Sequence, residues 1–211
     1  MRYFKGIFLI VTLACATQCV FADSLYTFDS VDRTYNNDIP ATLGFVFSVK
    51  NSFEVTSLGW FDDCLNGFQD PHTVSLYDTS SGTLLTSLTL APGTADPLQG
   101  SFRYHNITPV VLNPGDTYLL AGTTGGDDPY TENDDECGFT INPNFMVPEN
   151  AGRFVDNAPG FNYPDQHYSD YVTYAGPNLD GVPVGDAPEP ASLALLGIGA
   201  AGLLVGRRFR K

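Results

Sequence analysis

Basic residues are scarce in this 211-residue sequence, and most of them stand at its two ends. Between residues 23 and 186, only four basic residues accompany twenty-three acidic ones, which gives this central region a net charge of −19. A surface of that sign repels the phosphates of nucleic acid and the headgroups of anionic membranes. The charge therefore excludes nucleic acid as a partner and favours divalent cations, or simply solubility outside the cell.

Motifs for catalysis and for transition metals are also missing. The three histidines, His72, His105 and His167, are isolated and lack the spacing of zinc ligands, so surface or turn positions are expected for them. No Gly-x-Ser-x-Gly turn is present for a serine hydrolase. Carboxylates are abundant, but a glycosidase pair is defined by its geometry and not by abundance. These absences predict a protein that is not an enzyme and carries no cofactor, with a secreted hydrolase as the least favoured alternative.

Long stretches of helical periodicity are absent before the C-terminal tail, and short alternating stretches take their place. Residues 43–49, for example, place four large apolar side chains on one face of a strand. Turn-forming clusters such as residues 80–82 and 113–116 separate these stretches. The pattern predicts an all-β domain over residues 23–176, a single antiparallel β-sandwich of the jelly-roll or Greek-key type. A Gly/Pro-rich linker is predicted over residues 177–187.

The N-terminus has the layout of a secretory signal peptide. Arg2 and Lys5 precede a short apolar stretch, and small-residue spacing follows at Val20-Phe21-Ala22. The sequence therefore predicts a signal peptide over residues 1–22, cleavage after Ala22 and export of the central region.

The C-terminus has three parts in a fixed order. Pro188-Glu189-Pro190 keeps the backbone extended, because proline disfavours helix at the preceding residue. The sixteen uncharged residues 191–206 would span about 24 Å as a helix, at the short end for a membrane crossing. The basic cluster Arg207, Arg208, Arg210 and Lys211 then follows, and such charge stays cytoplasmic. The tail thus predicts a single transmembrane helix with the central region outside.

This three-part tail resembles the PEP-CTERM sorting signal of Gram-negative bacteria. The resemblance implies that an exosortase, a membrane cysteine protease-transferase, recognises residues 188–211 and removes them from an inner-membrane intermediate. Exosortase and the secretion machinery are the implied partners, and the implied location is the cell surface or the extracellular matrix, beside exopolysaccharide. The stretches "VTSLGWFDD" and "HTVSLYDTSSGTLLTSLTL" resemble a small β-sandwich family found ahead of such tails, which implies the fold and no activity.

Removal of the signal peptide leaves two cysteines, Cys64 and Cys137. A single pair in an exported domain favours a disulfide. Closing so long a loop would restrict the unfolded chain by roughly 4–5 kcal/mol in the entropy model. Two free thiols are the alternative. The predicted bridge would bring together the acidic stretches that surround the two cysteines.

These acidic stretches are the candidate calcium ligands, since calcium prefers six to eight oxygen atoms. Residues 125–138, "GGDDPYTENDDECG", carry Asp127, Asp128, Asp134 and Asp135, and residues 62–70 add further acids. Neither stretch has the spacing of an EF-hand. The alternative is a solvated acidic surface without a bound ion.

Aromatic residues support a third interpretation, a carbohydrate-binding module of the exopolysaccharide matrix. Tyr163, Tyr168, Tyr171 and Tyr174 are crowded together, and Trp60 stands just before an acidic stretch. Exposed aromatic faces near carboxylates suit stacking on sugar rings. In sandwiches, however, aromatic side chains mostly fill the core, and the sequence leaves both alternatives open.

Overall fold

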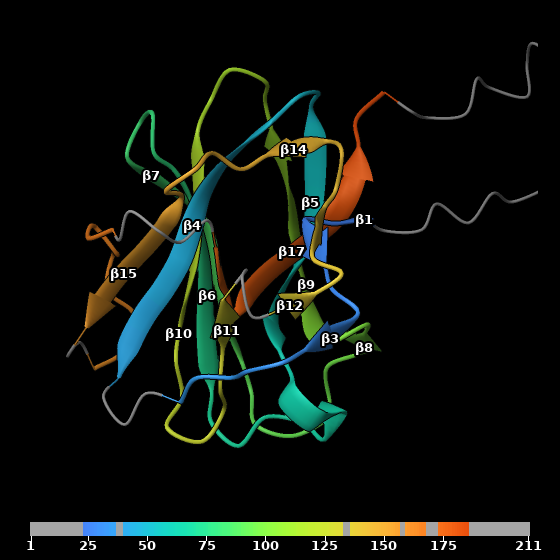
Figure 1. The fold of residues 1–211 in the computed structure, drawn as a ribbon. Coiled ribbons are helices and arrows are strands. Elements are labelled where there is room, and N and C mark those ends of the chain that lie inside the picture. Colours follow the sequence, from blue (N-terminus) through green and yellow to red (C-terminus); the bar gives the residue numbers. More distant parts are fainter. Residues whose placement is uncertain (1–22, 37–39, 133–135, 157–158, 168–172, 186–211) are drawn as a thin grey trace, which may run out of the picture.

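A computed structural model describes residues 23–36, 40–132, 136–156, 159–167 and 173–185 (Figure 1). Their regular structure consists of strands and one short 3-10 turn, η1 (Asp63–Leu65), so the predicted all-β class is confirmed. The predicted signal peptide and sorting signal lie outside the described residues. Within the described part of the chain, no helix is long and apolar enough to span a membrane.

The larger of the two main sheets has six strands, and all of its pairs are antiparallel. Its strands, in spatial order, are β14 (Phe145–Met146), β4 (Ala41–Val49), β10 (Tyr118–Thr123), β6 (His72–Asp78) and β7 (Thr83–Leu90), and β15 (Gly152–Asp156) also pairs with β4. The apolar face predicted for β4 is buried, and the alternation is visible in its second half, where Val46 and Ser48 are less buried than Phe45, Phe47 and Val49. Strand β10 lies between β4 and β6, so strands far apart in the sequence pair in this sheet.

The second main sheet has five strands, and its order is also non-sequential. They are β1 (Asp23–Ser24), β17 (Pro177–Pro183), β5 (Phe53–Phe61), β9 (Phe102–Leu112) and β8 (Leu98–Gln99). The two sheets share one hydrophobic core and form a β-sandwich, in which Trp60 of β5 stacks on His72 of β6 at a ring distance of 4.6 Å. A Cβ atom on Gly122 would lie 2.6 Å from the indole, so glycine at this position leaves room for Trp60.

Strand β17 corrects the predicted linker over residues 177–187. Residues Pro177–Pro183 pair with β5 along its whole length and are mostly buried. The two prolines stand at the ends of the strand, where a missing N–H is tolerated. Gly181 lies at a bulge, and a side chain there would collide with the backbone oxygen of Glu54. Proline and glycine therefore shape a buried strand here and do not mark a linker.

Three pairs of two-residue strands tie the N-terminal segment and the later loops to the sandwich. They are β2 (Tyr26–Thr27) with β13 (Thr140–Ile141), β3 (Ser30–Val31) with β12 (Glu136–Cys137), and β11 (Thr131–Glu132) with β16 (Tyr174–Ala175). The rings of Tyr26 and Phe28 pack on Phe102 at 5.3 and 5.4 Å. The N-terminal segment is therefore part of the folded domain.

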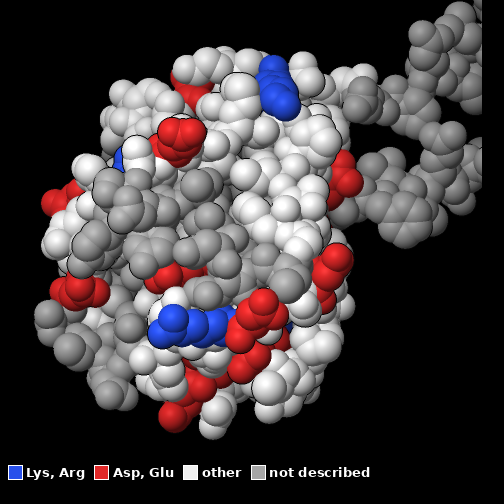
Figure 2. Space-filling model, viewed as in Figure 1, with Lys and Arg blue, Asp and Glu red and all other residues white. Residues whose placement is uncertain are grey.

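The surface carries the charge imbalance of the sequence. In Figure 2, acidic side chains are scattered over the visible face, whereas basic side chains occur only at isolated places. Two of the basic residues in the body are also engaged with backbone or buried groups: Arg103 is buried, and Arg153 donates to the carbonyl oxygens of residues 150–152. The described surface therefore offers little to attract a polyanion.

Candidate functional site

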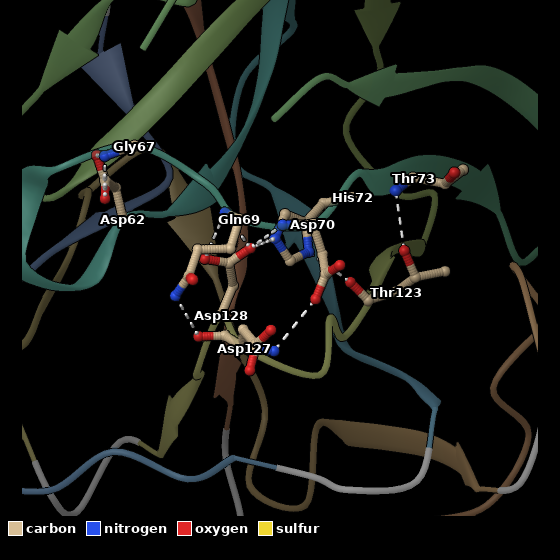
Figure 3. A network of polar contacts seen from close by, with 9 residues as sticks. All are labelled: Asp62, Gly67, Gln69, Asp70, His72, Thr73, Thr123, Asp127 and Asp128. Carbon is tan, nitrogen blue, oxygen red and sulfur yellow. Dashed lines mark hydrogen bonds and ion pairs between the residues drawn. The ribbon is translucent and has the colours of Figure 1, made fainter. Parts of the chain in front are cut away.

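Two loops, one between β5 and β6 and the other after β10, are joined around the carboxylate of Asp128 (Figure 3). Its oxygen Oδ2 accepts the backbone N–H of Gln69 at 2.8 Å and that of Asp70 at 2.7 Å. In return, the Asp70 carboxylate accepts the backbone N–H of Asp127 at 3.1 Å. Because each loop both donates to and accepts from the other, the two loops are held side by side.

The side chain of His72 lies between this carboxylate and the core. Its Nδ1 is 2.9 Å from the carbonyl oxygen of Thr123, and its Nε2 is 3.1 Å from Oδ2 of Asp128. Both partners are acceptors, because a carbonyl has no proton to donate and this Oδ2 already accepts two N–H groups. Both ring nitrogens therefore lie against acceptors of the loop and the core. The ring also stacks on Trp60, with the two rings inclined by 9°.

The ionisation of Asp128 follows from these donors. Burial raises the pKa of its carboxyl group, but the hydrogen bond from His72 and those from the backbone of Asp70 and Gln69 together lower it more. The net result is a pKa below the usual value for aspartic acid. Asp128 is therefore a carboxylate that the fold uses as a structural acceptor.

A second ion pair fixes the neighbouring loop. The Nε of Arg103 donates to Oδ2 of Asp62 at 2.6 Å, and both side chains are almost fully buried. The same carboxylate accepts the backbone N–H of Gly67 at 3.0 Å. The remaining guanidinium nitrogens donate to the carbonyl oxygens of Asp96 and Leu65, at 3.0 and 3.3 Å. The partners of the Arg103 side chain lie in η1 and in loops beside it, so this side chain holds η1 and these loops in place.

The predicted calcium ligands are divided by this arrangement. Asp128 uses its oxygens as acceptors for N–H groups, and Asp127 is exposed beside it. Asp134 and Asp135 lie outside the described residues. Among the residues that the structure does describe, no group of three or more His, Cys, Asp or Glu side chains could hold a metal ion. The predicted meeting of the two acidic stretches does occur, at residues 69–70 and 127–128, but hydrogen bonds cause it.

The predicted disulfide between Cys64 and Cys137 is not formed. Cys64 is a free, exposed cysteine in η1, whereas the backbone of Cys137 pairs with Ser30 in the β12–β3 ladder. The neighbouring Asp63 carboxylate, followed by partial desolvation, raises the pKa of the Cys64 thiol. Since the thiolate is the reactive form, an acidic neighbour disfavours oxidation.

The aromatic residues considered for sugar stacking are mostly in the core. Trp60 is fully buried and Tyr174 is 4% exposed, so neither presents a face to solvent. Tyr163 is 46% exposed, and Tyr168 and Tyr171 lie outside the described residues. The core alternative is therefore correct for Trp60 and Tyr174.

The histidines differ from one another in their surroundings. His105 is exposed, and its Nδ1 contacts the Asp96 carboxylate at 2.7 Å. His167 is exposed as well. The expected surface or turn position is wrong for His72, which is fully buried in the network around Asp128.

A further buried carboxylate, that of Asp180, lies on β17 opposite Ser24 of β1. The Nε2 of Gln99 donates to Oδ2 of Asp180 at 3.0 Å and to the hydroxyl of Ser24 at 3.3 Å. The backbone N–H of Gly181 donates to the other carboxylate oxygen at 2.9 Å. The hydroxyl of Tyr104 also donates to Ser24, at 3.1 Å. Three strands and the N-terminal segment thus share one polar cluster.

The pKa of Asp180 is shifted in the opposite direction to that of Asp128. Burial is the largest cause and raises it, and the hydrogen bonds from Gly181 and Gln99 lower it by less. The carboxylate of Asp23 adds a further increase. Asp180 therefore has a pKa above the usual value, as expected for a buried acid with few donors and no cation.

A family model described as "Domain of unknown function (DUF4082)" matches residues 29–174, more than half of the chain. The chain belongs to this family. The DUF4082 match begins after β2 and ends before β17, although β17 lies between β1 and β5 in the sheet. The folded domain of this DUF4082 chain therefore extends beyond the match at both ends.

A second family model, described as "PEP-CTERM protein-sorting motif", matches residues 186–211. This range contains Pro188-Glu189-Pro190, the apolar span and the basic end, so the recognition of the tail is confirmed. The motif suggests an extracellular protein that is processed by an exosortase. No curated protein matches the DUF4082 chain.

Sequence reasoning missed both buried polar clusters. His72 and Asp128 are separated by 56 positions, and Gln99 and Asp180 by 81. No short motif marks either pair. A signal was available only for the separate Arg103–Asp62 pair, because a basic residue at a strand position in an almost entirely acidic body implies a buried acidic partner.

Proposed function

We propose that this chain is an exported, non-enzymatic protein of the bacterial envelope or extracellular matrix, processed by an exosortase. The observation that carries the proposal is the PEP-CTERM motif at residues 186–211, which directly follows the last strand. The proposal includes the signal peptide over residues 1–22, cleaved after Ala22, and the transmembrane helix before processing.

The short distance between body and tail supports this topology. Strand β17 ends at Pro183, and the five steps from there to Pro188 reach at most about 18 Å when extended. Asp23, the first described residue, pairs with Gly181 of the same strand (Figure 1). Both ends of the body therefore leave from one edge of the five-stranded sheet, which suits a chain whose leader and tail enter the same membrane.

The buried ionisable groups take part in structural hydrogen bonds and ion pairs, which supports a role without catalysis. A general base needs a lone pair within reach of a substrate proton. The carboxylates of Asp128 and Asp62 instead accept backbone N–H groups and pair with His72 and Arg103. These groups hold loops together, and their hydrogen-bonding capacity is used in doing so.

Mass spectrometry of the protein from its native host tests the sorting proposal. Mature protein is expected to begin at Asp23 and to lack the residues after about Pro190, as the tail-recognition mechanism requires. Glu189→Ala is expected to keep the tail and to leave the protein in the membrane fraction. Glu149→Ala, in an exposed loop of the body, is the matched control and should be processed normally. An intact C-terminus on protein released from the surface would refute the proposal.

A carbohydrate-binding role is the second candidate. The sequence suggested it from exposed aromatic faces, but Trp60 and Tyr174 are buried, and only Tyr163 of the described aromatic residues named for it is exposed. The support now comes from the polar cluster around Gln99 and Asp180, which borders an open pocket.

A further inference from the structure

The pocket beside Gln99 has a volume of about 270 Å³. The N-terminal strands contribute Asp23, Ser24 and Thr27 to its lining, and Asn142 and Pro143 line it from the segment after β13. A smaller hollow of about 70 Å³ shares Ser24, Thr27 and Gln99 and continues toward Phe102. The pocket is thus built by segments that are far apart in the sequence and are fixed by β-pairing.

The amide of Gln99 is held in one orientation. Only its nitrogen can donate to the Asp180 carboxylate, and the same nitrogen also reaches Ser24. Its Oε1 therefore remains available as an acceptor and has no hydrogen-bond partner among the described residues. Because Asp180 is itself fixed by the N–H of Gly181, the position of Oε1 is set before any ligand arrives.

The amide of Asn142 offers the complementary group. Its Oδ1 accepts the backbone N–H of Asn144 at 3.0 Å, which directs Nδ2 away from that contact. Within the described part of the chain, Nδ2 has no acceptor, so it presents two donors. The pocket thus combines a fixed acceptor, a fixed donor and the ring of Pro143, an exposed apolar surface.

The charges around the pocket restrict the ligand. None of the lining residues is basic, and the lining includes the Asp23 carboxylate, with Asp180 directly behind Gln99. Cleavage after Ala22 would add an α-ammonium group at Asp23, which its own carboxylate offsets. Phosphate, sulfate and uronate groups are therefore disfavoured. The volume is slightly below the roughly 300–1,000 Å³ typical of drug-sized ligands, so one ring fits and a long chain does not.

We propose that this pocket binds a neutral sugar residue, whose hydroxyl groups donate to Oε1 of Gln99 and accept from Nδ2 of Asn142. Hydroxyl groups on adjacent carbons both donate and accept, and the C–H face of a sugar ring packs on an apolar surface such as Pro143. Asp180 is a positioning residue, since it orients the Gln99 amide without touching the ligand. The inference names the site and ligand class for the second candidate function and is independent of the sorting proposal.

Titration of the full chain with simple sugars tests the inference. Glucose, galactose and N-acetylglucosamine, each with its methyl glycoside, are compared with glucuronate by calorimetry and by saturation-transfer NMR. At least one neutral sugar is expected to bind with a Kd of about 0.1–10 mM, and glucuronate at least about tenfold more weakly. Equal binding of the methyl glycoside would support recognition of a residue within a glycan, and binding of the free sugar alone would support a free monosaccharide.

Two variants locate the binding. Gln99→Ala and Asn142→Asp should each weaken sugar binding about tenfold or more. Asn142→Asp does so because it replaces the NH2 donor with an acceptor oxygen of the same size and shape. Gln69→Ala, an exposed glutamine of the loop before β6, is the matched control and should bind as the parent does. If Gln99→Ala lowers the melting temperature strongly, its loss of binding could reflect misfolding, and Asn142→Asp then serves as the test of the binding site. No binding of any neutral sugar, equal binding of glucuronate, or unchanged binding in folded Asn142→Asp would overturn the inference.

Discussion

Two aspartates of this protein are buried to a similar extent and yet differ in the direction of their pKa shift. Asp128 and Asp180 are 7% and 3% exposed. Asp128 accepts two backbone N–H groups and contacts Nε2 of His72, and its pKa is lowered. Asp180 accepts one side-chain amide and the next backbone N–H, and its pKa is raised. Burial alone does not decide the ionisation of an acid, because the number and charge of its donors outweigh it.

The surroundings of the two aspartates also differ in their access to a ligand. Around Asp128, the donors and acceptors satisfy one another, and the result is a joint between two loops. Around Asp180, the donated hydrogen bonds engage the Gln99 amide nitrogen, and Gln99 lines an open pocket. The family match covers Asp128 but not Asp180, Asp23 or Ser24. The strands outside the match therefore complete the region that is open to a ligand.

Removal of the Asp128 carboxylate is expected to have the largest effect. Asp128→Ala leaves the buried His72 ring without the partner of its Nε2 and two backbone N–H groups without an acceptor. Breaking such a buried pair costs about 3–5 kcal/mol of unfolding free energy. Urea denaturation measures the loss. Asp127→Ala, one residue away and exposed, is the matched control and should change stability by less than about 0.5 kcal/mol. Similar losses in both variants would contradict the structural role of Asp128.

Acid should weaken the joint around Asp128 specifically. A carboxyl group whose pKa is lower in the folded than in the unfolded state contributes stability above its unfolded pKa, about 3.9. That contribution is lost as the pH falls through the lowered folded value. Urea midpoints measured between pH 7 and pH 3 should therefore fall more steeply for the parent than for Asp128→Asn. Parallel pH profiles would show that another group dominates the acid response.

Asp180 should behave in the opposite sense, with a smaller amplitude. Because its pKa is raised in the folded state, its contribution is fully present below the unfolded value and is lost as the pH rises through the folded value. Asp180→Asn removes the titration but keeps one acceptor oxygen for two donors, Gln99 Nε2 and the Gly181 N–H, so the loss of one hydrogen bond offsets the relief of a buried charge. At pH 7 it should leave stability unchanged or raise it by up to about 1 kcal/mol. A large loss in this variant, measured by urea denaturation, would mean that the ionised carboxylate is needed.

The sequence could predict features that depend on neighbouring residues, but not contacts between residues far apart in the chain. Alternation of apolar residues is a local property, so strands such as β4 could be recognised from residues 41–49 alone. Strand β17 was missed because Pro177, Gly181 and Pro183 are turn formers by local criteria and strand residues only beside β5. The meeting of the two acidic loops was correctly predicted from a disulfide that does not exist. Contacts across 56 or 81 positions, which build both polar clusters, leave no local pattern to find.

The loops around η1 should not depend on Cys64 for their stability. Hydrogen bonds to Asp62 and Asp128 hold them, and the thiol is free and exposed. Cys64→Ser should therefore change the unfolding free energy by less than about 0.5 kcal/mol. Alkylation without reductant should label Cys64 quantitatively, with Cys64→Ser as the blank. Peptide mapping that links Cys64 to Cys137 in exported protein would restore the disulfide.

The smallest effect is expected from divalent cations, which test whether the acidic loops do more than interact with water and salt. A body with a net charge of −19 is stabilised by any screening ion, and such screening acts alike for calcium and magnesium. A calcium site would differ, because specific binding stabilises the folded state by about 2.7 kcal/mol at a hundredfold excess over its Kd. Since Asp128 already uses its oxygens for N–H groups, we expect equal small shifts in melting temperature with the two ions at equal ionic strength. A larger shift with calcium, abolished by Asp134→Asn together with Asp135→Asn, would instead assign an ion to the acidic loop beside the Asp128 joint.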